Sequence, residues 1–184
     1  SSKNAVIGLG LTGGYYNLPS NAFYDPENNV GIAYYYYEGR DLTVSTADME
    51  NELNDYIKIL STGCIDLEQF SYTIDASDMN VVSSINDGSV DVGVDYPLVV
   101  TAGDNVYTLS DSYDVSLDVN LYNMNTVASN IVRNDINNPD FVDLNFLLGQ
   151  GLSNIEYVPY DIITIIYVLK DDSSFNGEGY TFMF

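Results

Sequence analysis

Residues 86–89 carry the strongest local fold signal in this chain, the turn sequence Asn-Asp-Gly-Ser between two apolar runs. An Asp-Gly pair between apolar segments is typical of a tight β-hairpin, because both positions tolerate a positive φ. The flanking runs, Met79–Ile85 and Val90–Val100, are therefore expected to be paired strands. From residue 90 to residue 95, valine alternates with aspartate or glycine, which predicts a strand with one buried and one solvent-exposed face.

Two helices are expected. Ser45 can cap the first, with Asp48 three residues on, and Gly63 is a plausible stop. Its apolar stripe consists of Met49, Leu53, Tyr56, Ile57 and Leu60. The second is expected from about Leu121 to Ile136 and is ended by Asn138-Pro139.

The remaining apolar segments predict mostly strands that are neighbours in sequence. They are Gly31–Tyr37, Phe70–Ile74, Val106–Leu109, Val115–Val119, Ile155–Val158, Ile162–Leu169 and Tyr180–Phe184. Val106–Leu109 and Val115–Val119 suggest a second hairpin around Asp111-Ser112. The segment Phe141–Leu148 fits either a short helix or a strand. The pattern predicts a single α+β domain over residues 1–184, with a predominantly antiparallel β-sheet and two helices packed on it.

The N-terminal stretch Val6–Leu11 alternates apolar residues with glycine. In a strand, Ile7, Leu9 and Leu11 would share one face. The alternative is the end of a helix, but glycine costs about 1 kcal/mol in a helix interior, so we expect residues 1–12 to form an extended arm. Such an arm could complete the sheet of a neighbouring copy by strand addition.

Charge and composition exclude several functions. The chain has 27 acidic and five basic side chains, a net charge of −22 and no histidine. Nucleic-acid binding needs clustered Lys and Arg, and an anionic membrane would repel this chain, so neither partner is expected. Without histidine and with one cysteine, the common zinc sites and serine hydrolase triads cannot form. We expect no enzyme activity and no cofactor, although a hydrolase based on two carboxylates is a minor alternative.

Calcium is the one metal that the sequence leaves open. It takes six to eight oxygen ligands, and the candidate side chains are Asp111, Asp114 and Asp118. On a strand, Asp114 and Asp118 would share a face, where a cation could relieve their repulsion. No twelve-residue calcium loop is present.

Tyrosine is the most informative of the over-represented residue types, and the chain contains 17 of them. Its ring is apolar and its hydroxyl polar, which suits interfaces and sugar sites as well as ordinary sheet surfaces. The candidate interface or ligand tyrosines are Tyr15, Tyr16, Tyr34, Tyr35, Tyr36 and Tyr37.

Features that bear on location are few. The longest apolar stretch, Ile162–Leu169, is far shorter than a membrane span. The opening Ser1-Ser2-Lys3-Asn4 is typical of a processed or truncated chain. Cys64 is the only cysteine, so it is either a spare thiol or the partner of a cysteine further upstream.

Several short motifs spread over the chain resemble a known group of proteins. They are Gly13-Gly14-Tyr15-Tyr16 with Leu18-Pro19, Ile32-Ala33-Tyr34-Tyr35-Tyr36, Cys64, Val94-Asp95-Tyr96-Pro97-Leu98 and Tyr180-Thr181-Phe182. In this order they resemble uncharacterised exported, membrane-anchored surface proteins of small-genome (DPANN-type) archaea. The resemblance implies export, a hydrophobic N-terminal anchor and a second cysteine ahead of the Gly-Gly-Tyr segment.

Together these observations predict a non-catalytic extracellular or cell-surface structural protein. Its copies would form a homo-oligomer or polymer, as a filament, tube or coat assembled by the N-terminal arm. The alternative is a secreted surface module that binds carbohydrate or a partner cell through tyrosines, with calcium as a further requirement.

Overall fold

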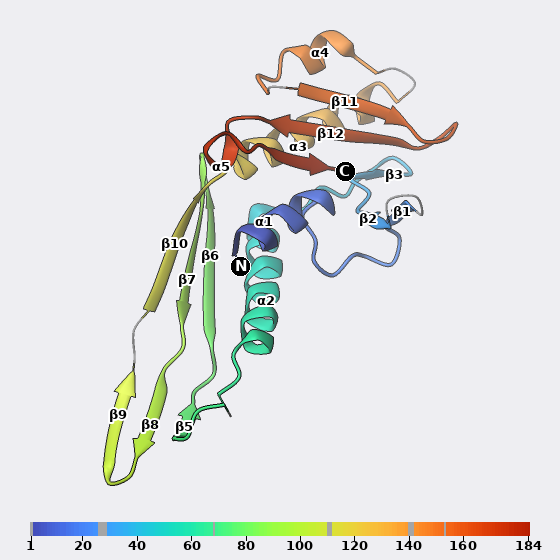
Figure 1. Ribbon diagram of the computed structural model, residues 1–184. Helices are drawn as coiled ribbons and strands as arrows, with labels where there is room; N and C mark the ends of the chain where they lie inside the picture. Colours follow the sequence, from blue (N-terminus) through green and yellow to red (C-terminus); the bar gives the residue numbers. More distant parts are fainter. Residues whose placement is uncertain (1, 26–28, 68, 110–111, 140–141, 153) are drawn as a thin grey trace.

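The structure is a computed structural model of the chain, and it describes every residue except 1, 26–28, 68, 110–111, 140–141 and 153. The described residues form an elongated molecule in which helices lie beside antiparallel sheets (Figure 1), which confirms the predicted α+β class. The helices are α1 (Ser2–Leu11), α2 (Thr46–Cys64), α3 (Leu121–Asn137), α4 (Leu144–Leu148) and α5 (Ser174–Gly177).

The strands of the described residues form three three-stranded sheets and two short hairpins. The first sheet has the order β10-β7-β6, with β6 (Asn80–Asn86), β7 (Ser89–Asp95) and β10 (Ser112–Asp118). The second has the order β11-β12-β13, with β11 (Asn154–Pro159), β12 (Ile165–Asp171) and β13 (Tyr180–Met183). The third has the order β5-β8-β9, with β5 (Thr73–Ala76), β8 (Leu98–Ala102) and β9 (Asn105–Leu109). The short hairpins pair β1 (Phe23–Asp25) with β2 (Val30–Ile32), and β3 (Tyr36–Tyr37) with β4 (Arg40–Asp41).

The hairpin predicted at residues 86–89 is confirmed. Asn86 pairs with Ser89, and Gly88 adopts a φ of +79° in the turn. On β7, Val90 and Val92 are buried, and Val94 is partly buried on the same face. The run Val90–Val100 is nevertheless two strands in two sheets, because Pro97 between them cannot donate a ladder hydrogen bond.

The main core lies where α2 and α3 cover the β6-β7 part of the first sheet. Ser45 caps α2 as predicted, since its hydroxyl accepts a hydrogen bond from the backbone N–H of Asp48 at 3.1 Å. The buried side chains of α2 are Met49, Leu53 and Ile57, all from the predicted stripe. The predicted second helix is confirmed as α3, and α3 also contacts β13, so the core continues into the second sheet.

The prediction of an extended arm over residues 1–12 is wrong, because residues 2–11 form the helix α1. Its end is marked by the hydrogen bonds Gly14 N–H to Leu9 O (2.8 Å) and Gly13 N–H to Gly10 O (3.4 Å), with Gly13 at φ +71°. These bonds and the left-handed glycine form a Schellman helix end. A Cβ atom at Gly10 would lie 2.4 Å from the carbonyl oxygen of Thr181, so this glycine lets α1 pack directly on β13. Tertiary packing thus outweighs the helix cost of glycine.

The third sheet projects away from the rest of the molecule, at the lower end of Figure 1. We call β5, β8 and β9 the projecting sheet. The predicted hairpin around Asp111-Ser112 is wrong, since β9 pairs with β8 through a turn at Gly103, and β10 pairs with β7. Residue 111 lies outside the described residues.

The tyrosine run 34–37 is not part of one continuous strand, as was expected for Gly31–Tyr37. β2 ends at Ile32 and β3 begins at Tyr36, and Glu38 and Gly39 follow with positive φ values of 50° and 79°. Two consecutive positive φ values are typical of a two-residue hairpin turn, which joins β3 to β4. The ambiguous segment Phe141–Leu148 contains the short helix α4, with residue 141 outside the described part.

Among the described residues, none of the helices combines the length and the apolar character that crossing a lipid bilayer requires.

Candidate functional site

The six candidate tyrosines fall in two separate places. Tyr15 is partly buried beside the core, and burial, together with the charges of Asp48 and Glu52, raises its pKa. Tyr16 is exposed and stacks on Tyr56 of α2, with ring centroids 4.0 Å apart. This pair holds the loop after α1 against α2, which is a structural contact.

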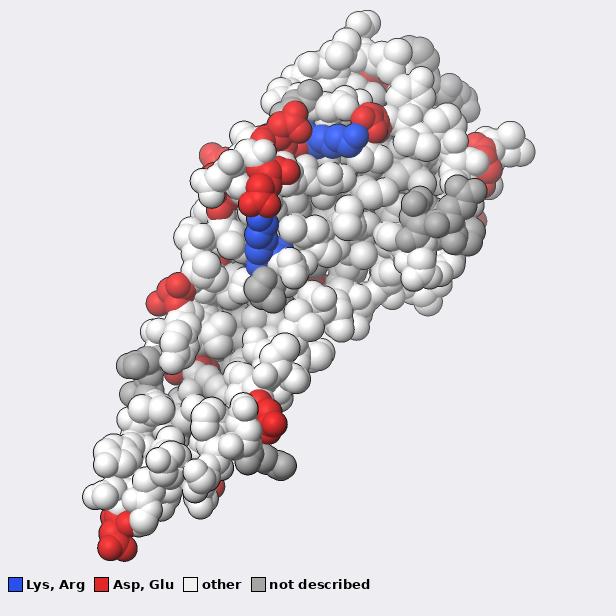
Figure 2. All heavy atoms as spheres, in the orientation of Figure 1, with Lys and Arg blue, Asp and Glu red and all other residues white. Residues whose placement is uncertain are grey.

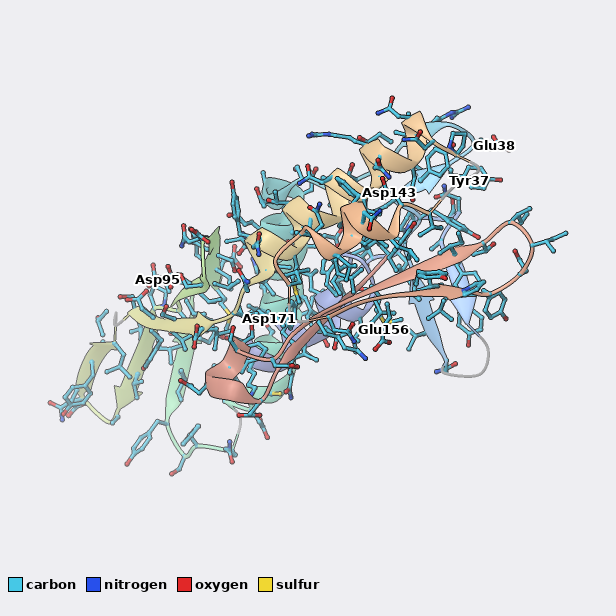
Figure 3. All side chains as sticks on the ribbon, turned by 90° about the horizontal axis from the view of Figure 1, so that it is seen from above. Tyr37, Glu38, Asp95, Asp143, Glu156 and Asp171 are labelled. Carbon is cyan, nitrogen blue, oxygen red and sulfur yellow. The ribbon has the colours of Figure 1, made fainter. Side chains whose placement is uncertain are left out.

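The second place is a pocket lined by consecutive residues of the tyrosine run. Tyr34, Tyr35 and Tyr36 all line it, whereas Tyr37 is exposed and its ring lies 5.4 Å from that of Tyr34. Tyr37 and Glu38 mark this end of the molecule in Figure 3, away from Asp95 at the end of β7. Of the four tyrosines, only Tyr35 is fully buried, with its hydroxyl 3.3 Å from the Asn125 side-chain oxygen, to which it donates.

We call this cavity the tyrosine pocket. It has a volume of about 430 Å³ and lies between the tyrosine run, the C-terminal end of α3 and the start of β12. Its remaining described lining residues are Val132, Asp135, Asn138, Pro139, Val142, Ile162, Ile163, Thr164, Ile165, Tyr167 and Phe184. Most of this lining is apolar or aromatic, and a volume of this size is within the range of small-molecule sites.

Asp135 is the only charged residue among the described residues that line the tyrosine pocket. The Tyr167 hydroxyl donates a 2.9 Å hydrogen bond to its carboxylate. Burial raises the pKa of Asp135, and the bond from Tyr167 only partly opposes this. The pKa of Tyr167 is raised in turn, first by burial and then by the neighbouring negative charge. Asp135 is therefore a partly desolvated carboxylate in an aromatic surrounding.

A turn with two exposed isoleucines forms one rim of this pocket. Ile162 is fully exposed and Ile163 almost so, although they were expected to begin a buried strand. Asp161 organises the turn by accepting hydrogen bonds from the backbone N–H groups of Ile163 (2.8 Å) and Thr164 (2.6 Å). These bonds lower the pKa of Asp161. We call residues 161–164 the isoleucine turn.

Among the described strands, β9 of the projecting sheet has the most exposed large apolar side chains. Val106, Tyr107 and Leu109 of β9 are 64%, 55% and 50% exposed. Paired residues of an antiparallel ladder point to the same side, so the register divides the sheet into two faces. One face, which we call the apolar face, consists of Ile74, Ala76, Leu98, Val100, Ala102, Asn105, Tyr107 and Leu109.

The opposite face of the projecting sheet contains Val99 and Val106 together with three threonines and Asp75. The apolar face has no charged residue, although the chain has a net charge of −22. In Figure 2 the narrow lower part of the molecule is mostly uncharged on the visible side, with acidic residues at its tip and scattered along it.

The calcium candidates are not brought together. Asp114 and Asp118 are on one face of β10, four residues apart, which is about 13 Å along a strand and too far for one ion. Asp111 lies outside the described residues. Within the described residues no group of three or more acidic, His or Cys side chains could hold a metal ion. Calcium binding stays an untested prediction.

The three residues of the expected assembly arm belong to α1. Leu9 is buried, and Ile7 and Leu11 are partly buried. In this conformation Leu9 belongs to the chain's own core and Ile7 packs against it. The only cysteine, Cys64, is exposed at the end of α2.

Asp135, Tyr167 and the isoleucine turn were not predicted as site residues. No local motif marks Asp135, because it comes from the end of a helix that meets β12 only in the folded chain. The isoleucine turn did have a signal: Asp161 precedes Ile162 as a turn-forming residue that can accept backbone hydrogen bonds.

No protein-family model, no curated protein and no solved structure matches the chain. The resemblance to archaeal surface proteins therefore stays a prediction, and the function has to be argued from the surfaces themselves.

Proposed function

We propose that this protein is a non-catalytic structural subunit of an extracellular surface assembly, a filament, tube or coat, whose copies join through the apolar face of the projecting sheet. The observation that carries the proposal is that this face presents a row of apolar side chains that ends in the half-exposed Tyr107 and Leu109, while Leu98 and Val100 in the middle strand are only partly buried. A contiguous exposed apolar surface often marks an interaction site, so this face is best explained by a partner.

A second copy of the chain is the occupant that the charge favours. Two molecules of charge −22 repel each other over most of their surface. The apolar face is uncharged, so two copies can meet there without bringing carboxylates together. A basic partner would gain nothing at this surface.

The edge of the projecting sheet supports the same conclusion. β9 is at the edge and reads Asn-Val-Tyr-Thr-Leu, without Lys, Pro or any charge. Natural edge strands usually carry such residues to prevent pairing with other chains. Their absence from β9 is expected where association is the function.

The isoleucine turn provides a second contact, since it lies at the other end of the elongated molecule (Figures 1 and 3). Its two isoleucines are held outward by the hydrogen bonds to Asp161. A subunit with contacts at both ends can build an open chain, whereas one self-complementary face alone would stop at a dimer. This arrangement replaces strand addition by residues 1–12.

The test compares two aspartate substitutions on the same strand. Tyr107→Asp places a charge on the apolar face, and Val106→Asp places the same charge on the opposite face. We expect the native protein to form large assemblies by light scattering and electron microscopy, Tyr107→Asp to abolish them, and Val106→Asp to leave most of them. Circular dichroism of the monomers would establish that both variants fold.

A native protein that stays monomeric at high concentration would contradict the proposal. Equal loss of assembly in both variants would show that the edge of β9, and not the apolar face, makes the contact. Labelling of intact source cells with antibody tests the extracellular location: we expect surface signal, and signal only after permeabilisation would contradict it.

A second candidate function, a surface module that binds a ligand, is favoured by one separate observation. The tyrosine pocket gathers three residues of the tyrosine run around a partly buried carboxylate, far from the projecting sheet. Binding of carbohydrate there would be detected by a glycan array, with and without a calcium chelator. The absence of binding in both conditions would contradict this second function.

A further inference from the structure

We propose that the tyrosine pocket binds an organic ammonium cation carried on an apolar stem. This inference goes beyond the self-assembly proposed above: the pocket shares no residue with the projecting sheet, and the isoleucine turn, which we proposed as the second assembly contact, forms only one rim of it. The cavity of about 430 Å³ is large enough for a small cation or for a lysine-like side chain of a partner.

The sign of the ligand's charge follows from the lining. Among the described lining residues, Asp135 is charged and no Lys or Arg is present. The whole chain adds a net charge of −22, so its field concentrates cations near the pocket and repels anions. The lining and the net charge therefore favour a cationic over an anionic ligand.

The aromatic rings favour an ammonium group in particular. Tyr34, Tyr36 and Tyr167 line the same cavity as Asp135. A cation over the face of an aromatic ring is attracted by the negative charge density of that face, and the attraction is strongest when the cation is desolvated. Several rings around one carboxylate can thus replace the water that an ammonium group loses on binding.

The partial burial of Asp135 is a second, independent reason to expect a cationic ligand. A partly buried carboxylate is normally paired with a cation or fully hydrogen-bonded. Within the described residues, the carboxylate of Asp135 receives only the hydrogen bond from Tyr167, and both salt bridges of that part of the chain lie elsewhere. Burial raises its pKa, so the free protein bears a cost that a bound cation would offset.

The apolar walls define the rest of the ligand. Val132, Pro139, Val142 and Ile165 line the cavity, and they suit methylene or methyl groups beside the charge. A sugar fits this lining less well, because its many hydroxyls need partners. Among the described lining residues, the polar side chains other than tyrosine are those of Asp135, Asn138 and Thr164.

Isothermal titration with choline and with 3,3-dimethyl-1-butanol, which replaces the charged nitrogen by carbon, tests the inference. The two probes have nearly the same shape, so their difference reports the charge. We expect choline to bind roughly ten-fold more tightly than the neutral alcohol. Methyl glucoside serves as the carbohydrate probe, and we expect it to bind more weakly than choline.

Two variants show whether the pocket is the site. Asp135→Asn keeps the shape of the side chain and removes its charge, and we expect it to remove most of the preference for choline over the neutral alcohol. Asp114→Asn, an exposed acid on β10, changes the net charge of the chain equally and should leave choline binding unchanged.

Three results would overturn the inference: no choline binding, equal affinity for choline and its neutral isostere, or the same preference in Asp135→Asn as in the native protein. Since burial makes Asp135 costly, Asp135→Asn should fold, and near-ultraviolet circular dichroism would verify this. Tyr167→Phe provides a further check, because it keeps the aromatic ring while removing the hydroxyl, and it should retain choline selectivity.

Discussion

The β6-β7 hairpin and the β8-β9 hairpin have similar sequences and opposite environments. Both consist of two β-strands with apolar residues joined by a tight turn that contains a glycine, Gly88 in one and Gly103 in the other. On β7 Val92 is 1% exposed, while Leu109 on the apolar face of β9 is 50% exposed. The difference is not in the strands themselves but in what covers them.

The length of α2 accounts for this difference. A helix of 19 residues spans about 28 Å, whereas the two strands from Ser89 to Ala102 span about 45 Å. α2 therefore covers the first sheet and ends at Cys64, before the projecting sheet begins (Figure 1). A strand pattern thus predicts that a strand forms, but the covering element decides whether it becomes core or interface.

The largest effect is expected from removing a covered leucine. Leu169→Ala on β12 should cost about 2–5 kcal/mol of unfolding free energy, because Leu169 is fully buried and leaves a cavity. Leu109→Ala on the apolar face should cost less than about 1 kcal/mol in dilute protein. Urea unfolding at low protein concentration measures both. Equal costs would show that the projecting sheet is packed like the rest of the molecule.

The two glycines inside α1 should respond in opposite directions. A Cβ atom at Gly10 would meet the Thr181 carbonyl and the Tyr180 hydroxyl at 2.4 Å, so Gly10→Ala should destabilise the fold by about 1–3 kcal/mol. Gly8 has no atom within 4 Å of that position, so Gly8→Ala should stabilise α1 by about 0.5–1 kcal/mol. Thermal unfolding compares them, and destabilisation by both would contradict the packing of α1 on β13.

Asp171 connects two parts of the covered region. It is buried and accepts hydrogen bonds from the hydroxyls of Ser173 (2.8 Å) and Ser174 (2.7 Å), and Ser174 in turn accepts one from the backbone N–H of Asn120. Burial alone would raise the pKa of Asp171, but the hydrogen bonds from the two serines outweigh it and lower the pKa. Asp171→Asn should cost about 1–3 kcal/mol at neutral pH.

The lowered pKa of Asp171 also sets the direction of its pH dependence. The stabilisation is complete above the unfolded-state pKa of aspartate, near pH 4, and is lost as the pH falls through the lower folded-state pKa. Asp171→Asn should therefore lose less stability than the native protein on acidification below about pH 4. Urea unfolding over a pH series tests this, and parallel curves for both proteins would contradict it.

The smallest effect is expected at Ser83, which the helices cover. Its hydroxyl is buried and has no hydrogen-bond partner among the described residues. Ser83→Ala should leave stability unchanged or raise it by about 1 kcal/mol, whereas Ser84→Ala on the exposed side of β6 should have no effect. A clear loss at Ser83 would show that its hydroxyl has a partner.

Local signals in the sequence were enough for the regular elements. The Asp-Gly turn, the cap at Ser45 and the valine alternation each specify a local geometry, and β6, β7 and α2 are found close to where they were predicted. The end of α1 also had such a signal, because Gly13-Gly14 marks a helix C-terminus.

The arrangement of the elements could not be predicted in the same way. Whether β9 pairs with β8 or with β10 depends on which sheet each strand joins, and both neighbours are close in sequence. The candidate tyrosines 34–36 were identified, but the pocket needs Asp135 and Tyr167 from distant segments. Only the tertiary fold brings such residues together.

Hydrogen–deuterium exchange at increasing protein concentration tests most directly whether the projecting sheet is an interface between copies. We predict that the backbone amides of β8 and β9 become protected as the concentration rises, while those of β6 and β7 are protected at every concentration. Exchange in β8 and β9 that stays fast and independent of concentration would contradict the account.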